Sequence, residues 1–169
     1  KGCPKVFAKC GFDVMIGNPP YVRQKLIKNI NKFIEKKFMS YNGKADLFVY
    51  FYEKAYQIVK GNGIVSFISS GKFFEASYGK KIITFLVENS TLIEVIDFKD
   101  LNIFEGISAY PLILSFQKTK KEKYYFKYEN ASEIKVEKLS DIIQHLSFDL
   151  ISIDDFIANN YSFIDEKIK

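Results

Sequence analysis

Runs of strand composition alternate with amphipathic helical patterns through the first two-thirds of the chain, and no other feature of the sequence constrains the fold as much. The runs with the apolar composition of strands are residues 12–17, 64–69, 92–98 and 111–117. The segments with helical spacing of apolar residues are 25–38, 46–60 and 78–89. Because strands that alternate with helices of about a dozen residues are typical of βαβ units, we predict an α/β fold with a mostly parallel sheet.

The boundaries of the helix at 46–60 are signalled directly. Asp46 precedes an aromatic-rich run and is placed to cap its first turn, and Gly61 and Gly63 follow the end of the run. The sequence Gly61-Asn62-Gly63 follows a helix and precedes a strand, whereas a dinucleotide-binding loop needs the order strand, loop, helix. We therefore interpret it as a turn.

The character of the sequence changes near Thr119, where a lysine-rich stretch at 120–123 begins. The strand-like and helical patterns beyond it are short: 124–128, 139–146 and 153–160. Residues 1–118 carry 17 Lys and Arg against 10 Asp and Glu, whereas 119–169 carry 8 against 10. We therefore predict two regions divided at residue 118, of which the second is a short α+β tail.

The composition excludes several classes of protein. A length of 169 residues suits one domain, and 47% apolar residues with 27% charged residues exclude wholesale disorder. The longest uncharged apolar run, 47–52, is far below the roughly 18 residues of a membrane span, and no secretory leader pattern opens the chain. Two cysteines and one histidine cannot build a disulfide framework or a Cys/His zinc site. We expect a soluble, cytoplasmic bacterial or archaeal protein with no metal and no membrane partner.

A basic run lies between residues 23 and 44. It contains one acid, Glu35, and the following basic residues: Arg23, Lys25, Lys28, Lys32, Lys36, Lys37 and Lys44. Such a patch attracts polyanions, and nucleic acid is the obvious candidate. A solvated helix face on a lysine-rich protein gives the same pattern, so charge alone leaves both interpretations open.

The sequence Asn18-Pro19-Pro20-Tyr21 directly follows the strand predicted at 12–17. Two successive prolines fix the backbone and supply no N–H donors, so the turn is stiff and lined by carbonyls. Asn18 adds an amide oxygen, and Tyr21 adds a flat π face. Together they could hold a planar group that carries an amino function, although Asn-Pro is also a common start of a plain turn.

These residues belong to a longer resemblance. Residues 12–24, FDVMIGNPPYVRQ, resemble motif IV of the amino-group DNA methyltransferases, in the NPPY form of adenine-N6-specific enzymes from large combined restriction-modification proteins. In the same order, 45–55 resemble motif V, 59–70 resemble motif VI and 104–118 resemble motif VIII. The resemblance covers about residues 5–118, and more weakly the tail is similar to the start of a target-recognition region. It implies the C-terminal half of a Rossmann-like methyltransferase sheet with a final antiparallel strand.

The resemblance implies roles for single residues. The side-chain oxygen of Asn18 and the backbone carbonyl of Pro19 would accept hydrogen bonds from the N6 amine of an adenine flipped out of double-stranded DNA. The amine would then attack the methyl group of S-adenosylmethionine, a positioning effect that needs no general base. Tyr21, with Pro20 in the catalytic turn, would stack on one face of the base and Phe104 on the other. Stacking is worth about 1–3 kcal/mol per base, comparable with the cost of extrusion.

Two further assignments follow from the resemblance. Phe51 is expected to line the pocket for the cofactor adenine, with Phe48 and Tyr50 as rivals on the same helix. Arg23, Lys25, Lys28 and Lys32 lie just beyond the catalytic turn and are expected to contact the DNA backbone. Phosphate contacts of this kind position the DNA but do not read its sequence.

The sequence also departs from the family. The glycine-rich cofactor loop should lie upstream of motif IV, together with the acids that bind the ribose and adenine. We therefore expect the C-terminal half of a catalytic domain, cut from a longer polypeptide on which it depends, with most of the S-adenosylmethionine site upstream and no activity alone. The strand at 12–17 would then lie at a sheet edge and could pair with a second copy.

Other functions are weighed against this interpretation. A protein glutamine-N5 methyltransferase also uses an Asn-Pro-Pro-Tyr turn, but the motif V and VIII resemblances and the basic run argue against it. A non-catalytic DNA-binding module is a second alternative. Asp97-Phe98-Lys99 has the form of half a nuclease site, yet this pattern is common by chance and no suitably placed Pro-Asp precedes it.

Overall fold

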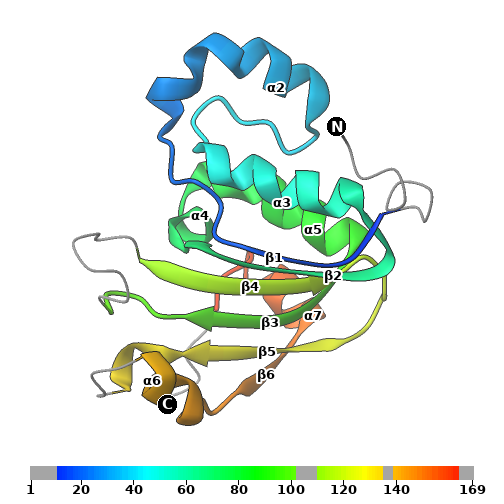
Figure 1. Ribbon diagram of the computed structural model, residues 1–169. Coiled ribbons are helices and arrows are strands. Elements are labelled where there is room, and N and C mark those ends of the chain that lie inside the picture. Colours follow the sequence, from blue (N-terminus) through cyan, green and yellow to red (C-terminus); the bar gives the residue numbers. More distant parts are fainter. Residues whose placement is uncertain (1–10, 102–109, 135–138, 164–169) are drawn as a thin grey trace.

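Within residues 11–101, 110–134 and 139–163, which the computed structural model describes, six strands form one sheet in the order β1-β2-β4-β3-β5-β6 (Figure 1). The strands are β1 (Phe12–Gly17), β2 (Val59–Ser70), β3 (Thr91–Asp97), β4 (Pro111–Gln117), β5 (Tyr125–Asn130) and β6 (Asp149–Ser152). Strands β1, β2, β3 and β5 are parallel, β4 lies antiparallel between β2 and β3, and β6 is antiparallel to β5. The predicted α/β class with a mostly parallel sheet is confirmed.

The helices connect these strands in the predicted order. They are α2 (Asn31–Lys37), α3 (Leu47–Ile58), α4 (Lys72–Glu75), α5 (Lys80–Asn89), α6 (Leu139–Gln144) and α7 (Ile153–Ala158). Three 3₁₀ helices accompany them: η1 (Gln24–Ile30), η2 (Ser77–Gly79) and η3 (Ala131–Glu133). The sequence did not indicate α4 or β6, which have four residues each and show no periodicity. None of the helices described here is long and apolar enough to cross a membrane.

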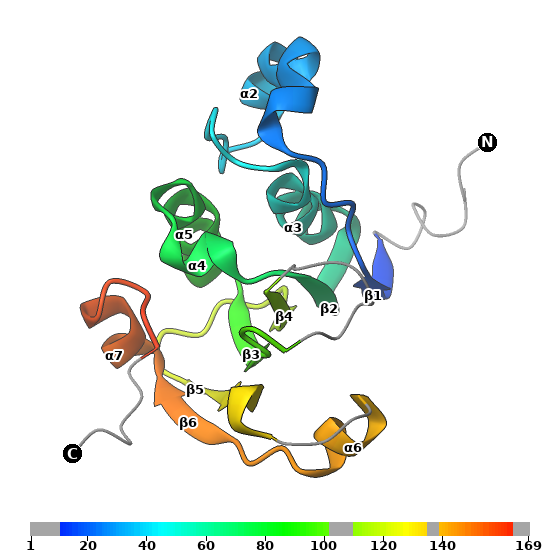
Figure 2. The same cartoon turned by 90° about the vertical axis from the view of Figure 1, so that its left-hand side faces the viewer.

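Helices α3, α5 and α7 cover one face of the sheet (Figure 2). Helix α3 packs on β2, α5 on β3 and α7 on β6. The aromatic ring of Tyr52 in α3 packs 5.4 Å from Phe67 and 5.6 Å from Phe73 between centroids. The Tyr52 hydroxyl is 2.8 Å from Ser69 Oγ, so its polar end is also satisfied. Burial of a side chain of this size contributes about 1.5–3 kcal/mol, which fixes α3 on β2.

The opposite face is covered unevenly in the described part of the chain. Near β3 and β5, Ile142 of α6 belongs to a small apolar cluster with Ile96 and Phe98. At the other end, Val14 and Ile16 of the edge strand β1 are 52% and 82% exposed. Among the described strands, residues 12–17 lie at an edge of the sheet, as expected.

The basic run folds as two consecutive helices rather than the single helix predicted at 25–38. It forms η1 and then α2, which lie on the side of α3 away from the sheet (Figures 1 and 2). Ile27 and Ile34 are buried and the lysines are exposed. The apolar stripe expected from the sequence is only partly confirmed, because Leu26, Ile30 and Phe33 are also exposed.

The sequence predicted a turn at Gly61-Asn62-Gly63. These residues instead form an irregular part of β2. Asn62 has a φ of 64°, and the register with β1 shifts between Phe12 and Val14. A Cβ on Gly63 would lie 2.9 Å from the Phe12 carbonyl oxygen, so β1 approaches too closely for a side chain. Strands β5 and β6 extend the same sheet, and the division at residue 118 stays a prediction.

Candidate active site at the carboxyl end of β1

The Asn18-Pro19-Pro20-Tyr21 turn leaves the sheet where β1 ends. Gly17 lets the backbone pass close to Phe67 as it leaves the sheet, because a Cβ on residue 17 would lie 3.2 Å from the Phe67 ring. Asn18 is exposed and Pro19 is buried. Within the described residues neither the Asn18 side chain nor the Pro19 carbonyl receives a hydrogen bond, whereas the Pro20 carbonyl accepts one from the Val22 N–H at 2.9 Å. The Asn18 side chain and the Pro19 carbonyl thus have no hydrogen-bond donor among the described residues.

Tyr21 presents a partly exposed ring next to these acceptors. The ring is 37% exposed, and its centroid lies 6.0 Å from that of Phe48 on α3. Burial raises the pKa of the Tyr21 hydroxyl above its ordinary value. Phe104, the second predicted stacking residue, lies outside the described residues, and its role stays a prediction.

The sequence analysis left three aromatic residues of α3 as candidates for the cofactor pocket, and they differ in exposure. Phe48 and Tyr50 are buried, and the Tyr50 hydroxyl donates to the Asn42 carbonyl at 2.7 Å. Phe51 is 38% exposed. It lines an apolar pocket of about 170 Å³ between α2 and α3 with the following residues: Ile30, Phe33, Ile34, Phe38, Leu47, Tyr50 and Lys54. Tyr50 and Phe51 thus both line the pocket, and of the three aromatic residues Phe51 is the most exposed.

The four residues expected to contact the DNA backbone, Arg23, Lys25, Lys28 and Lys32, are all exposed along the turn, η1 and α2. No salt bridge within the described ranges joins any of them to an acid. Their positive charge is therefore not neutralised by a neighbouring side chain.

Glu53, which the sequence analysis did not single out, anchors the segment between α2 and α3. Its carboxylate is buried and accepts hydrogen bonds from the Met39 and Ser40 N–H groups at 2.9 and 2.8 Å and from the Ser40 hydroxyl at 2.6 Å. A charge-assisted hydrogen bond is roughly twice as strong as a neutral one, so this carboxylate fixes the end of the basic helix against α3. An acidic residue inside an aromatic-rich helical pattern is the sequence signal that could have identified Glu53.

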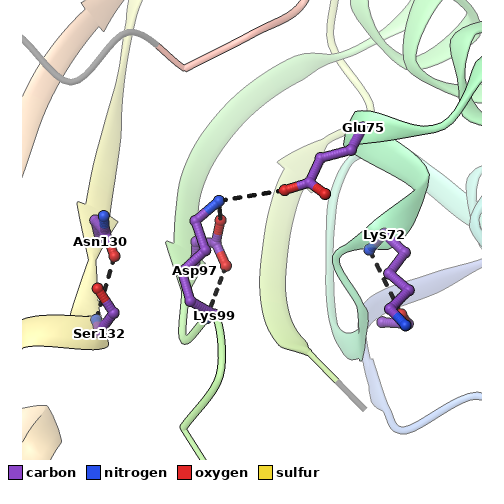
Figure 3. Close-up of polar contacts among 7 residues, drawn as sticks. Lys72, Glu75, Asp97, Lys99, Asn130 and Ser132 are labelled. Carbon is purple, nitrogen blue, oxygen red and sulfur yellow. Dashed lines mark hydrogen bonds and ion pairs between the residues drawn. The ribbon is translucent and has the colours of Figure 1, made fainter. Parts of the chain in front are cut away.

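A group of charged residues lies at the carboxyl end of β3, on the same edge of the sheet (Figure 3). Lys99 Nζ is 2.8 Å from Asp97 Oδ2 and 3.5 Å from Glu75 Oε1, and the Lys99 N–H donates to Asp97 Oδ1. Burial lowers the pKa of Lys99, but the hydrogen bond and charge of Asp97, with Glu75, outweigh this and raise it. Pairing with Lys99 gives the buried Asp97 a structural role, which accounts for the nuclease-like pattern.

The comparisons with known proteins agree with this geometry. The sequence matches the family described as Eco57I restriction-modification methylase over residues 1–104, which is more than half of the chain. The chain belongs to this family. The predicted resemblance to restriction-modification methyltransferases is thereby confirmed.

Curated proteins with sequences similar to this chain are type II methyltransferases. M.BstVI of Geobacillus stearothermophilus is 35% identical over 104 residues, which make up 60% of this chain and 18% of that protein. The restriction enzyme and methyltransferase RM.Eco57I of Escherichia coli is 29% identical over 119 residues, or 68% of this chain and 12% of that protein. The chain thus spans less than a fifth of the length of these relatives.

Solved structures of low sequence identity share the fold. The type IIG restriction endonuclease BpuSI superposes with a TM-score of 0.63 at 15% identity, over 91% of this chain and 21% of that protein. A protein from Listeria monocytogenes described as a class I S-adenosylmethionine-dependent methyltransferase gives 0.60 at 16% identity, over 90% and 43%. The predicted Rossmann-like methyltransferase fold is confirmed.

Proposed function

We propose that the intact protein containing this chain transfers a methyl group from S-adenosylmethionine to the N6 amine of an adenine flipped out of double-stranded DNA. It would act within a restriction-modification system in the cytoplasm of a bacterium or archaeon. The observation that carries this proposal is the turn at the end of β1, where the Asn18 side chain and the Pro19 carbonyl accept no hydrogen bond from a described residue and the next aromatic residue, Tyr21, is partly exposed.

The two acceptors match the chemistry of an exocyclic amine. An amine on an aromatic ring delocalises its lone pair and is a poor nucleophile. Hydrogen bonds from both N–H groups to the Asn18 side-chain oxygen and the Pro19 carbonyl hold the nitrogen in place and orient its lone pair out of the ring plane. This is transition-state stabilisation by fixed dipoles, and proton removal can follow methyl transfer.

The base needs a platform as well as acceptors. The face of Tyr21 is held by its contact with Phe48, so little entropy is lost when a base stacks on it. Together with Phe104 on the opposite face, such stacking offsets the few kcal/mol of base extrusion.

The cofactor supplies an electrophilic methyl group. The apolar pocket beside Phe51 suits the flat adenine ring of S-adenosylmethionine, since aromatic and aliphatic side chains line it and Phe51 is partly exposed. Phe51 would hold that ring, and the rest of the cofactor site is expected upstream of the β1 turn.

Analysis of the methylated nucleoside tests the proposal. The intact protein is incubated with duplex DNA and methyl-labelled S-adenosylmethionine, and the DNA is digested to nucleosides. We expect the label in N6-methyldeoxyadenosine. Label in N4-methyldeoxycytidine would correct the target base, label in protein glutamine would favour the glutamine-N5 alternative, and unlabelled products with retained DNA binding would favour the non-catalytic module.

We further propose that the isolated chain forms a dimer through β1. Among the described strands β1 lies at one end of the sheet and exposes Val14 and Ile16, and an apolar edge strand is a template for strand pairing. We expect Ile16→Lys to convert a dimer of the isolated chain to a monomer in analytical ultracentrifugation. Leu150→Lys, on the exposed edge strand β6, is the matched control and should leave the dimer intact. A monomeric wild-type chain would contradict the proposal.

A further inference from the structure

Asp46 precedes α3 but does not cap it. It occupies the N-cap position in extended conformation, the position predicted from the sequence, yet its side chain accepts no hydrogen bond from its own helix. Instead Asp46 Oδ1 accepts the N–H of Gln24 at 2.8 Å, 22 residues earlier in the chain. The predicted local cap is thus replaced by a long-range contact with the segment that follows the catalytic turn.

A second hydrogen bond runs beside this contact. The N–H of Leu47, the first residue of α3, donates to the Val22 carbonyl at 2.9 Å. The two bonds hold Val22 and Gln24, just after Tyr21, to Asp46 and Leu47. The Val22 N–H in turn donates to the Pro20 carbonyl at 2.9 Å. The backbone on the C-terminal side of the catalytic turn is therefore tied to the start of α3 by consecutive hydrogen bonds.

The same helix also sets the position of the Tyr21 ring. The ring of Phe48, the second residue of α3, lies 6.0 Å from the Tyr21 ring and 6.0 Å from the Phe73 ring between centroids. The backbone after Tyr21 and the Tyr21 ring are thus both held by α3, and Tyr52 fixes α3 on the sheet. An N-cap side chain usually accepts a hydrogen bond from its own helix, and here that interaction is directed at the segment after the turn instead.

We propose that Asp46 is a positioning residue for methyl transfer, which acts by holding Tyr21 and the preceding acceptors where the flipped base must lie. The inference rests on the proposed function of the Asn18 to Tyr21 turn. A misplacement of about 1 Å in a reacting geometry can cost 10²-fold in rate, so one hydrogen bond at this point affects the chemistry more than it affects DNA binding. The Asp46 carboxylate serves as an acceptor, and its charge is not required.

Two substitutions in the intact methyltransferase separate this role from a general effect on stability. Asp46→Ser supplies a good N-cap for α3 but is too short to reach Gln24, so the helix keeps its stability while the link is lost. Asp46→Asn keeps an oxygen at the same place. Ser152→Ala is the matched control. It removes the N-cap hydrogen bond of α7, in which Ser152 Oγ accepts from the Asp154 N–H at 3.2 Å.

The readouts are the single-turnover rate of methyl transfer and the dissociation constant for DNA. We expect Asp46→Ser to lower the rate about tenfold with DNA affinity within twofold, and Asp46→Asn and Ser152→Ala to stay within twofold of wild type in both. A wild-type rate in Asp46→Ser, or an Asp46→Asn enzyme as slow as the serine variant, would overturn the inference. If the wild-type protein itself does not methylate adenine, the proposed function fails first, and the two failures are thereby distinguished.

Discussion

Replacing Asn18 with alanine in the intact methyltransferase is expected to lower the rate of methyl transfer by about 10²- to 10³-fold, as the loss of one fixed transition-state dipole does in other enzymes. The side chain is exposed at the end of β1 and makes no hydrogen bond to any described residue, so its removal should cost little stability. It also carries no charge that could contact a phosphate. DNA affinity should therefore stay within about threefold, and the loss should appear in the rate of the chemical step.

Two further variants make the Asn18 experiment specific. Asn18→Asp keeps an acceptor oxygen and should retain more transfer than Asn18→Ala, because the N6 amine can still donate to it. Asn29→Ala changes an exposed asparagine of η1 and should leave the rate unchanged. Single-turnover methylation of a labelled duplex measures all three. Near-normal transfer by Asn18→Ala would show that the turn does not hold the reacting amine.

The parts of the fold that could be predicted are those fixed by local periodicity. Strand β1 and helix α5 each fall within two residues of the predicted bounds, because their apolar patterns are visible in the sequence. Helix α5 buries its apolar face, whereas no residue of β1 is fully buried, although the sequence favoured a buried strand. Strand β6 could not be predicted, since its four residues gain their stability from pairing with β5 and not from a pattern of their own. The bulge at Gly63 depends likewise on the approach of β1, which is distant in sequence.

The candidate site divides in the same way. The Asn18 to Tyr21 turn was recognisable because proline chemistry is local, whereas the partner of Asp46 was not, because the hydrogen bond to Gln24 spans 22 residues. Among the aromatic residues of α3 the sequence alone could not separate Phe48 from Phe51. The rotation of the helix on the sheet decides which of them is buried, and that rotation is a property of the packed core.

Replacement of Lys28, Lys32 and Lys36 by glutamine should weaken DNA binding by about 10- to 100-fold at physiological salt and reduce the slope of log affinity against log salt by about 2 to 3. The three side chains follow one another at four-residue spacing on η1 and α2, and all are exposed. Each phosphate contact releases condensed counterions, which is why the salt dependence reports the number of contacts directly. Glutamine keeps the length and helix propensity of the lysine side chain, so the loss of charge is measured alone.

The matched control for the lysine variant lies at the opposite edge of the sheet. Lys120, Lys121 and Lys123 are exposed between β4 and β5, at the amino ends of the parallel strands, and their replacement removes the same charge far from the turn. Any effect of net charge alone would appear equally in both variants. If η1 and α2 contact DNA, the salt slope of DNA affinity should change only in the variant of Lys28, Lys32 and Lys36. The single-turnover rate of that variant at saturating DNA should be unchanged, because these lysines position the duplex and do not touch the base. An unchanged slope would mean that the basic run is a solvated helix face, and that DNA reaches Asn18 from another direction.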